Sequence, residues 1–219
     1  MIKNLMILFV FTTSTLGAWD ASLDTAREVD YLNDWEKDVI FEMNKVRHDP
    51  QRYAQEVLKP LVAYYRGNIL NWPGQVPLQT QEGVRALNEL IRELERLPGG
   101  LPLLNPSQGM SLGAKDHARD QSRTGQVGHY GSDRSDPFKR LNRYGSWLGT
   151  AGENIEYGSA NGQQSVIFLL IDDGVRDRGH RKNILNARFL VAGVATASHP
   201  VYRTVTVTTF AQGFQDSQR

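Results

Sequence analysis

Apolar side chains recur at helical spacing along much of the chain. The first such run places apolar residues at Leu32, Trp35, Val39, Met43 and Val46. Positions three or four apart lie on one helix face, so the run predicts an amphipathic helix over residues 31–48. A similar run from Val84 to Leu97 predicts another helix, ended by Pro98-Gly99-Gly100.

Three dipeptides have the character of helix starts. Asp49-Pro50 predicts a helix that is capped by the aspartate, has proline at its first position, and ends before Pro60. Pro106-Ser107 predicts a longer helix, and Asp136-Pro137 a short one that ends at Gly145. The inward face of the longer helix carries Met110, Ala114, His117, Ala118 and Gln121.

Strand signals are concentrated near the C-terminus. Residues 189–197 and 201–211 are rich in Val and Thr and are separated by His199-Pro200, which predicts a β-hairpin. Residues 166–171 are apolar throughout, so their periodicity does not distinguish a helix from a buried strand. Residues 60–80 are interrupted by Pro and Gly and predict a loop. Helices first and strands last indicate the α+β class.

Composition narrows the function classes. The 219 residues suit one domain or a tight pair, and 40% of them are hydrophobic, enough for a sizeable core. Basic and acidic residues nearly balance, 25 against 24, without a long run of one sign. A nucleic-acid partner is therefore not expected, because phosphate neutralisation requires a basic face. The absence of cysteine excludes disulfides, a cysteine nucleophile and thiolate metal ligands.

The N-terminus has the layout of a signal peptide. Lys3 precedes the apolar run 5–11, and residues 12–18 are small and polar. We expect residues 1–18 to be removed on export, leaving 19–219 as one domain; the alternative is a buried N-terminal helix. The apolar run is too short to anchor in a bilayer, and no other stretch would span one after cleavage. This predicts a secreted or periplasmic protein.

Four glycine-flanked polar segments carry the candidate chemistry. They contain His129, Glu153, the pair Asp172-Asp173 and His180. Glycine permits sharp turns and close backbone approach, so we expect these segments to converge on a cleft. Two imidazoles and two carboxylates suit either a divalent metal such as zinc or a proton-transfer set. Their spacing matches no local metal motif, and a single histidine is often only structural.

Two features of the predicted helix after Pro106 allow alternative interpretations. Gly109-Met110-Ser111-Leu112-Gly113 matches the nucleophile elbow of hydrolases, but that motif requires a strand-to-helix turn. The preceding residues 101–106 are broken by proline, so we do not expect an elbow. His117 lies on the inward face, either as a hydrogen-bonded core residue or as a support for the cleft.

Several motifs together resemble the CAP superfamily of SCP-like extracellular domains. They are Asn44–Arg47, Gly128-His129, Pro137–Leu141 before Gly145, Gly152–Ile155, Gly179–Leu185 and the closing hairpin. They occur in the family's order and span roughly residues 31–212. The resemblance implies a three-layer α–β–α sandwich around a mostly antiparallel sheet.

The same resemblance implies a cleft lined by two histidines and two acids. Carried over to this chain, these are His129, His180, Glu153 and either Asp172 or Asp173. Some family members bind a divalent metal at this cleft. The metal set implied here is His129, Glu153, Asp173 and His180, with Arg181 and His117 nearby.

Three departures from the family separate this chain from its compact members. An aspartate replaces the second acid, which is often Glu, and is one methylene shorter. Residues 60–104 form a long connection that we interpret as an inserted helix with its loops, either covering the cleft or packing elsewhere. Cysteines, usual in animal members, are absent, so the chain resembles the bacterial-type and protist-type branch.

Three functions are compatible with this pattern. The first is a monomeric extracellular module that binds a lipid, peptide, glycan or metal, since catalysis is not a general property of the family. The second is a metal-assisted hydrolase, a peptidase or esterase, with Glu153 as general base and Arg181 stabilising negative charge. The third is a structural or adhesive domain in which the histidines and acids form a polar core network.

Overall fold

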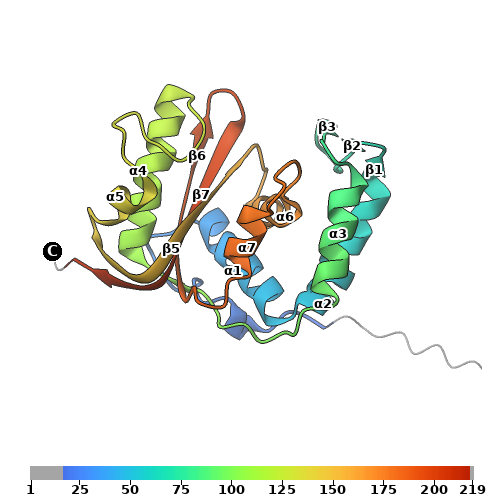
Figure 1. Cartoon of the computed structure of the whole chain (residues 1–219), viewed down its shortest axis with the longest axis horizontal. Coiled ribbons are helices and arrows are strands. Elements are labelled where there is room, and N and C mark those ends of the chain that lie inside the picture. The colour runs from blue at the N-terminus through green and yellow to red at the C-terminus, as the bar shows by residue number, and fades with distance from the viewer. Residues whose placement is uncertain (1–16, 218–219) are drawn as a thin grey trace, which may run out of the picture.

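A four-stranded sheet forms the centre of the computed structural model, which describes residues 17–217 (Figure 1). Its order is β4-β6-β7-β5, with β4 Asn105–Pro106, β5 Gly145–Tyr157, β6 Val191–His199 and β7 Arg203–Asp216. β4 runs parallel to β6, and the other pairs are antiparallel. The sheet is therefore mostly antiparallel, as predicted.

The predicted hairpin near the C-terminus is confirmed as β6 and β7. The register pairs His199 with Arg203 at the turn, and β7 lies between β6 and β5. Residues 205–211 are buried without interruption, because helices cover both faces of this central strand. β5, to which the sequence analysis assigned no element, completes the sheet by pairing with almost all of β7.

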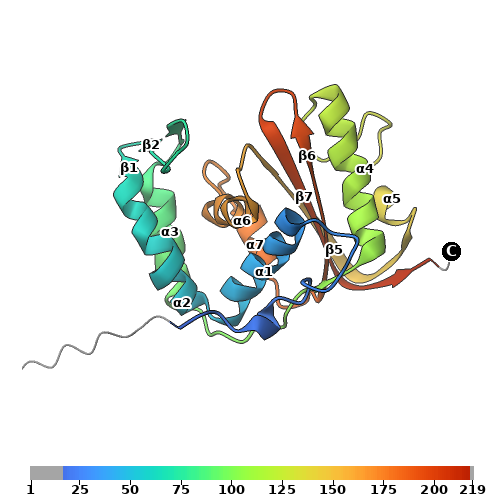
Figure 2. The ribbon, with the colours of Figure 1, turned by 180° about the vertical axis from the view of Figure 1, so that it is seen from behind.

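Helices cover both faces of the sheet (Figure 2). α4 Gln108–Thr124 and α5 Pro137–Leu141 lie on one face. α1 Asp34–His48, α6 Gly162–Ile171 and α7 Gly179–Ile184 lie on the other. This arrangement confirms the α–β–α sandwich, in which the sheet buries apolar side chains against two helical layers.

Side-chain caps fix where the helices begin. Asn33 forms a capping box with Glu36 at the start of α1. Asp49, Ser107 and Asp136 accept hydrogen bonds from backbone N–H groups at the starts that the sequence predicted. α6 settles the undecided residues 166–171 as helix.

The insertion contains more structure than the predicted helix and loops. The expected helix is present as α3 Val84–Leu94. Residues 60–80, expected to be a loop, instead continue the helical segment after α2 and then form a three-stranded antiparallel meander. In chain order, the elements that lead into the insertion and begin it are α2 Pro50–Tyr53, η2 Ala54–Leu58, η3 Lys59–Tyr64, β1 Tyr65–Arg66, β2 Ile69–Leu70 and β3 Leu78–Gln79.

Ion pairs attach the insertion to α7. Arg178 binds Glu82 at 2.7 Å and Glu89 at 2.9 Å. Arg181 binds Glu89 at 3.0 Å and Glu93 at 2.6 Å. Hydrogen bonds from Arg178 lower the pKa of both Glu82 and Glu89 to about 2. The insertion is thus fixed to the core by charge as well as by the apolar contacts of α3.

Within residues 17–217, no helix has the length and apolar character needed to cross a membrane. The predicted signal peptide lies almost entirely outside the described residues and stays a prediction. So does the assignment of residues 19–219 to one domain.

Candidate functional site

Two histidine–carboxylate pairs stand at the centre of the candidate site. His129 Nδ1 lies 2.9 Å from Glu153 Oε1, and His180 Nδ1 lies 2.6 Å from Asp172 Oδ1. The imidazoles are partly exposed, 46% for His129 and 26% for His180, whereas the two acid side chains are at most 2% exposed. Since each Nδ1 faces an acid, Nε2 is the nitrogen that each ring presents to a ligand.

Arg140 of α5 fixes the first pair. One guanidinium nitrogen donates to Glu153 Oε2 at 2.8 Å, and another donates to the carbonyl oxygens of His129 and Ser135. The side chains of Arg140 and Glu153 are both almost fully buried, at 2% and 1% exposure. Arg140 therefore positions both the backbone of His129 and its carboxylate partner. This role of Arg140 has no signal in the sequence, because it depends on a contact with β5.

His117 supports the residue that precedes His129. Its Nε2 lies 2.8 Å from the Gly128 carbonyl, to which Gln121 also donates. Tyr157 Oη accepts from the Gly128 amide at 2.9 Å, so both the N–H and the carbonyl group of Gly128 are held by side chains. Burial, with a further contribution from Arg140, lowers the pKa of His117, so the ring is neutral and donates through Nε2. His117 is thus a hydrogen-bonded core residue that also fixes the backbone next to His129, and a role in supporting a ligand cleft stays a prediction.

Asp172 holds the second pair through the backbone as well as the ring. It ends α6 in the left-handed conformation, with φ of 55°. Its Oδ2 accepts from the His180 amide at 2.9 Å, at the start of α7. Asn154 donates to the His180 carbonyl and accepts from Asn183. Since Asn154 follows Glu153 on β5, this strand connects the two pairs.

Two residues expected in the cleft have other partners. Asp173 accepts from the amides of Gln81 at 2.6 Å and Glu82 at 2.8 Å, so it positions the segment before α3. Arg181 is 1% exposed, and besides its glutamate partners it donates to the Leu170 carbonyl. The acid beside His180 is therefore Asp172. Arg181 links α7 to the insertion, and its place in a binding cleft stays a prediction.

The expected metal ligands do not gather at one point. Among residues 17–217, no group of three or more His, Asp or Glu side chains is arranged to hold a metal ion. His129 with Glu153 and His180 with Asp172 form separate pairs, and Asp173 belongs to neither. A metal at this site stays a prediction.

A groove lies between the second pair and the insertion. It encloses about 320 Å³ and is lined by Asp172 and His180 on one side and by Tyr65 and residues 78–81 on the other. A cavity of about 190 Å³ shares some of its lining and adds further aromatic side chains. The shared residues are Leu78, Tyr157 and Phe168, and the added aromatic residues are Trp72 and Tyr202. The insertion thus forms one wall of a groove that reaches His180.

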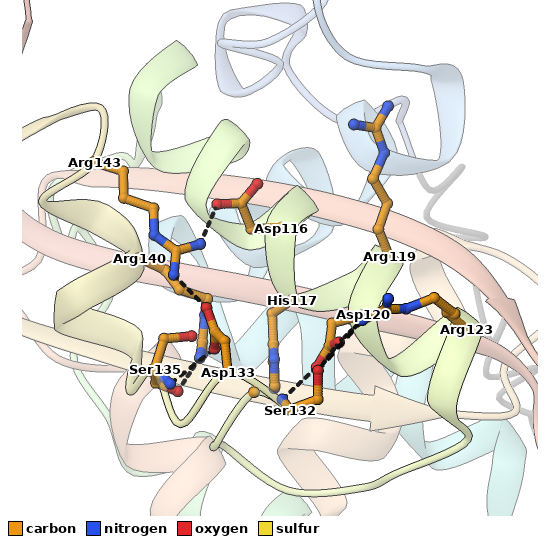
Figure 3. Close-up of a pocket in the computed structure, with 11 residues that line it drawn as sticks. Asp116, His117, Arg119, Asp120, Arg123, Ser132, Asp133, Ser135, Arg140 and Arg143 are labelled. Carbon is orange, nitrogen blue, oxygen red and sulfur yellow. Dashed lines mark hydrogen bonds and ion pairs between the residues drawn. The ribbon is translucent and has the colours of Figure 1, made fainter.

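A second cavity, of about 360 Å³, lies between α4 and the loop after His129 (Figure 3). Arg143 crosses it to bind Asp116 at 2.7 Å and Asp133 at 2.6 Å. Asp120 accepts from the Ser132 amide at 2.7 Å. Hydrogen bonds from Ser135, followed by Arg143, lower the pKa of Asp133. These charges hold the loop against α4 and α5.

The structure gives the hydrolase-elbow sequence a packing role. Residues 109–113 lie within α4, and Ser111 is buried and donates to the Ser107 carbonyl at 2.8 Å. A side chain at Gly113 would meet Leu141 of α5 at 3.1 Å. The glycine therefore allows close helix packing, and Ser111 has neither the turn nor the exposure of a nucleophile.

A three-layer α–β–α sandwich with paired histidines and acids beside its sheet defines a domain of the SCP class. The sequence profile of the cysteine-rich secretory protein family (CAP) matches residues 44–211, and the chain belongs to this family. The resemblance based on its motifs is therefore confirmed.

Similar proteins come from bacteria. The chain is 31% identical over 114 residues to the uncharacterized protein YkwD of Bacillus subtilis (strain 168), a match that covers 51% of this chain and 42% of YkwD. The chain thus spans less than half of that relative's length. An extracellular protein containing an SCP domain from Bacillus anthracis str. Ames matches 58% of this chain and 38% of its own, at 27% identity and a TM-score of 0.42. An outer surface protein of Borrelia burgdorferi matches 49% of this chain and 76% of its own, at 16% identity and a TM-score of 0.42.

Proposed function

We propose that this protein is a secreted binding module whose ligand occupies the groove beside His180. The observation that carries this proposal is the groove itself, in which the His180–Asp172 pair faces a wall built by the insertion. Pockets that join apolar surface to a few fixed polar groups are the usual form of ligand sites. Export of the protein agrees with its membership of the cysteine-rich secretory protein family.

The lining indicates a ligand with both apolar and polar parts. Tyr65, Leu78 and Phe168 provide apolar surface, and Gln79 and Gln81 provide amide groups. His180 adds an imidazole that Asp172 holds in one orientation, leaving Nε2 for the ligand. A ligand of this chemistry would be a peptide, a glycan or a lipid with a polar head.

A divalent metal, with zinc foremost, is a second candidate ligand. A carboxylate on the Nδ1 of a histidine is the partner that metal-binding imidazoles commonly have. His129 and His180 would then offer Nε2, and Glu153 and Asp172 would orient the rings. Both oxygens of Glu153 already accept hydrogen bonds, from His129 and Arg140, which argues against Glu153 as the general base of a hydrolase.

Binding is tested by titrating the isotope-labelled exported protein with peptides, oligosaccharides and lipid micelles, observed by NMR. We expect amides of residues 78–81 and 172–180 to shift with at least one class, and the shift to weaken in His180→Ala. His48→Ala, at an exposed helix end, is the matched control. Failure of all three classes to bind the folded protein, or binding confined to other surfaces, would contradict the proposal.

The metal is tested separately by calorimetric titration of zinc, magnesium and calcium into chelator-treated protein. One ion per chain, lost in a His129→Ala/His180→Ala double variant, would support a shared site. No heat of binding in folded protein would exclude the metal-assisted hydrolase.

A further inference from the structure

The charge of the groove is unlike that of the whole chain. Its lining contains three carboxyl groups, Glu156, Asp172 and Asp173, and neither lysine nor arginine. The chain as a whole has 25 basic and 24 acidic residues, so this separation of charge is local. A ligand that enters the groove meets only acidic side chains, one imidazole, and neutral groups.

Glu156 differs from the other two acids in its partners. Asp172 is bound by His180, and Asp173 by the backbone of the insertion. Glu156 is 6% exposed and accepts a hydrogen bond from Ser165 at 3.2 Å. Among the described residues it forms no ion pair. It is therefore a buried acid without a positive partner.

A nearby cation would stabilise the ionised form of Glu156. Burial raises the pKa of Glu156 to about 7, against weaker opposing hydrogen bonds from Ser159 and Ser165. The other titratable residues of the groove are Tyr65, Tyr157, Asp172, Asp173 and His180. A cationic group placed near Glu156 would supply the missing counter-charge, since a buried charge is tolerated when it is paired.

The strands that line the groove favour a peptide ligand, in which the cation would be a basic side chain. β3 is an edge strand of the meander, β5 is an edge strand of the central sheet, and residues of both line the groove. Edge strands can pair with an extended peptide through the backbone, while the spaces beside them accept alternate side chains. Leu78, Ile155 and Phe168 supply apolar surface for the residues on either side of the cation.

We propose that the groove binds an extended peptide segment that places a lysine or arginine side chain against Glu156, between apolar neighbours. The proposal rests on the groove being the binding site proposed above, and it names the ligand class. Glu156 is the residue that would select a basic side chain over a neutral one of similar size.

The pairing also predicts the direction of pH dependence. A cation favours the ionised form of Glu156, so binding at pH 6 must release a proton and is weakened. At pH 8 the carboxyl is already ionised in the free protein. Affinity for a basic peptide should therefore rise about tenfold from pH 6 to pH 8, whereas a neutral peptide lacks this dependence.

The test compares two peptides, acetyl-Val-Leu-Lys-Leu-Val-amide and the same peptide with Gln in place of Lys. Each is titrated into the exported protein at pH 6 and at pH 8, and binding is followed by NMR. The variants are Glu156→Gln and, as matched control, Glu28→Gln at an exposed position outside the groove. We expect the Lys peptide to bind about tenfold more tightly than the Gln peptide at pH 8. That preference should be lost in Glu156→Gln and kept in Glu28→Gln.

Equal binding of the two peptides would overturn the inference and leave the proposed binding groove intact. A Lys preference that survives in folded Glu156→Gln would also overturn it, because another group would then be selecting the cation. Binding of neither peptide at millimolar concentration would overturn it too, while the oligosaccharide and lipid titrations judge the groove independently. If Glu156→Gln does not fold, the pH dependence of the Lys preference in the unaltered protein decides.

Discussion

At the scale of single residues, the position of His129 depends on one buried arginine. Arg140 binds the carbonyl oxygen of His129 and the carboxylate that faces its ring. Replacing Arg140 by methionine should cost about 3–5 kcal/mol of unfolding free energy, because Glu153 would remain buried without its partner. Urea unfolding monitored by circular dichroism measures this cost.

A second substitution, at Glu153, tests whether the unpaired carboxylate causes the loss of stability in Arg140→Met. Adding Glu153→Gln to Arg140→Met should restore part of the lost stability, since the unpaired buried charge is removed. Lys139→Met, at the neighbouring exposed position, is the control. If Arg140→Met were no more destabilising than Lys139→Met, the buried pair would not stabilise the site.

The sequence identified most of the paired residues but not their exact partners. His129, Glu153 and His180 stand out because glycines flank them within motifs of the family. Asp172 and Asp173 are adjacent and chemically alike, and only the folded chain separates them, with Asp172 against His180 and Asp173 against the backbone before α3. The isolation of Glu156 is also invisible in sequence, because it depends on which distant residues line the groove.

At the scale of elements, local signals predicted the helices better than the sheet. Helix starts depend on one capping side chain and its neighbours, so Asp49, Ser107 and Asp136 were informative. β5 begins with the glycine-rich segment 145–152 and is a strand because β7 pairs with it. The two-residue strands of the meander have no periodicity to detect. Their partners lie within ten residues of each other, but strands this short lack the run of β-branched and aromatic residues from which a hairpin is predicted.

The attachment of the insertion should be sensitive to acid. Glu82 and Glu89 have pKa values lowered to about 2 in the folded protein, below the ordinary value of 4.5. Their stabilising effect is therefore complete above pH 4.5 and is lost as pH falls toward 2. Hydrogen-exchange protection of α3 should decrease over this range before that of α4 does.

A substitution at neutral pH distinguishes the effect of these ion pairs from general unfolding by acid. Arg178→Gln should weaken α3 protection at neutral pH, whereas Arg123→Gln, whose side chain is 75% exposed, should not. Simultaneous loss of protection in α3 and α4 in the unaltered protein would indicate that the insertion is held by apolar packing alone.

At the scale of the whole molecule, the groove exists because three separate parts of the chain meet. The sandwich supplies β5 and α6, the segment after α6 supplies His180, and the insertion supplies the opposite wall. Family motifs account for the sandwich and the histidine pairs. The insertion lies outside those motifs, so its wall of the groove is the part of the proposed binding site that the family motifs do not specify.

Arg47 of α1 joins the segment before β4 to the segment that follows α7. Its buried side chain donates to four carbonyl oxygens, that of Pro102 before β4 and those of Ile184, Asn186 and Phe189 at the end of α7 and beyond it. Burial lowers the pKa of Arg47 to about 10, so it is still charged at neutral pH. Replacing it by methionine removes a charged donor from four carbonyl groups, of which those of Ile184 and Phe189 are buried. The loss should be about 3 kcal/mol or more.

The segment before β4 and the segment that follows α7 both lead into the core. We therefore expect Arg47→Met to lower the melting temperature of the whole domain by about 10 °C in a single transition. Differential scanning calorimetry measures this, with Arg85→Met, whose side chain is 77% exposed, as the control. A shift equal to that of the control would mean that water replaces the guanidinium at no cost. A second, separate transition would mean that Arg47 stabilises only the connections, and that the sandwich and the insertion unfold independently.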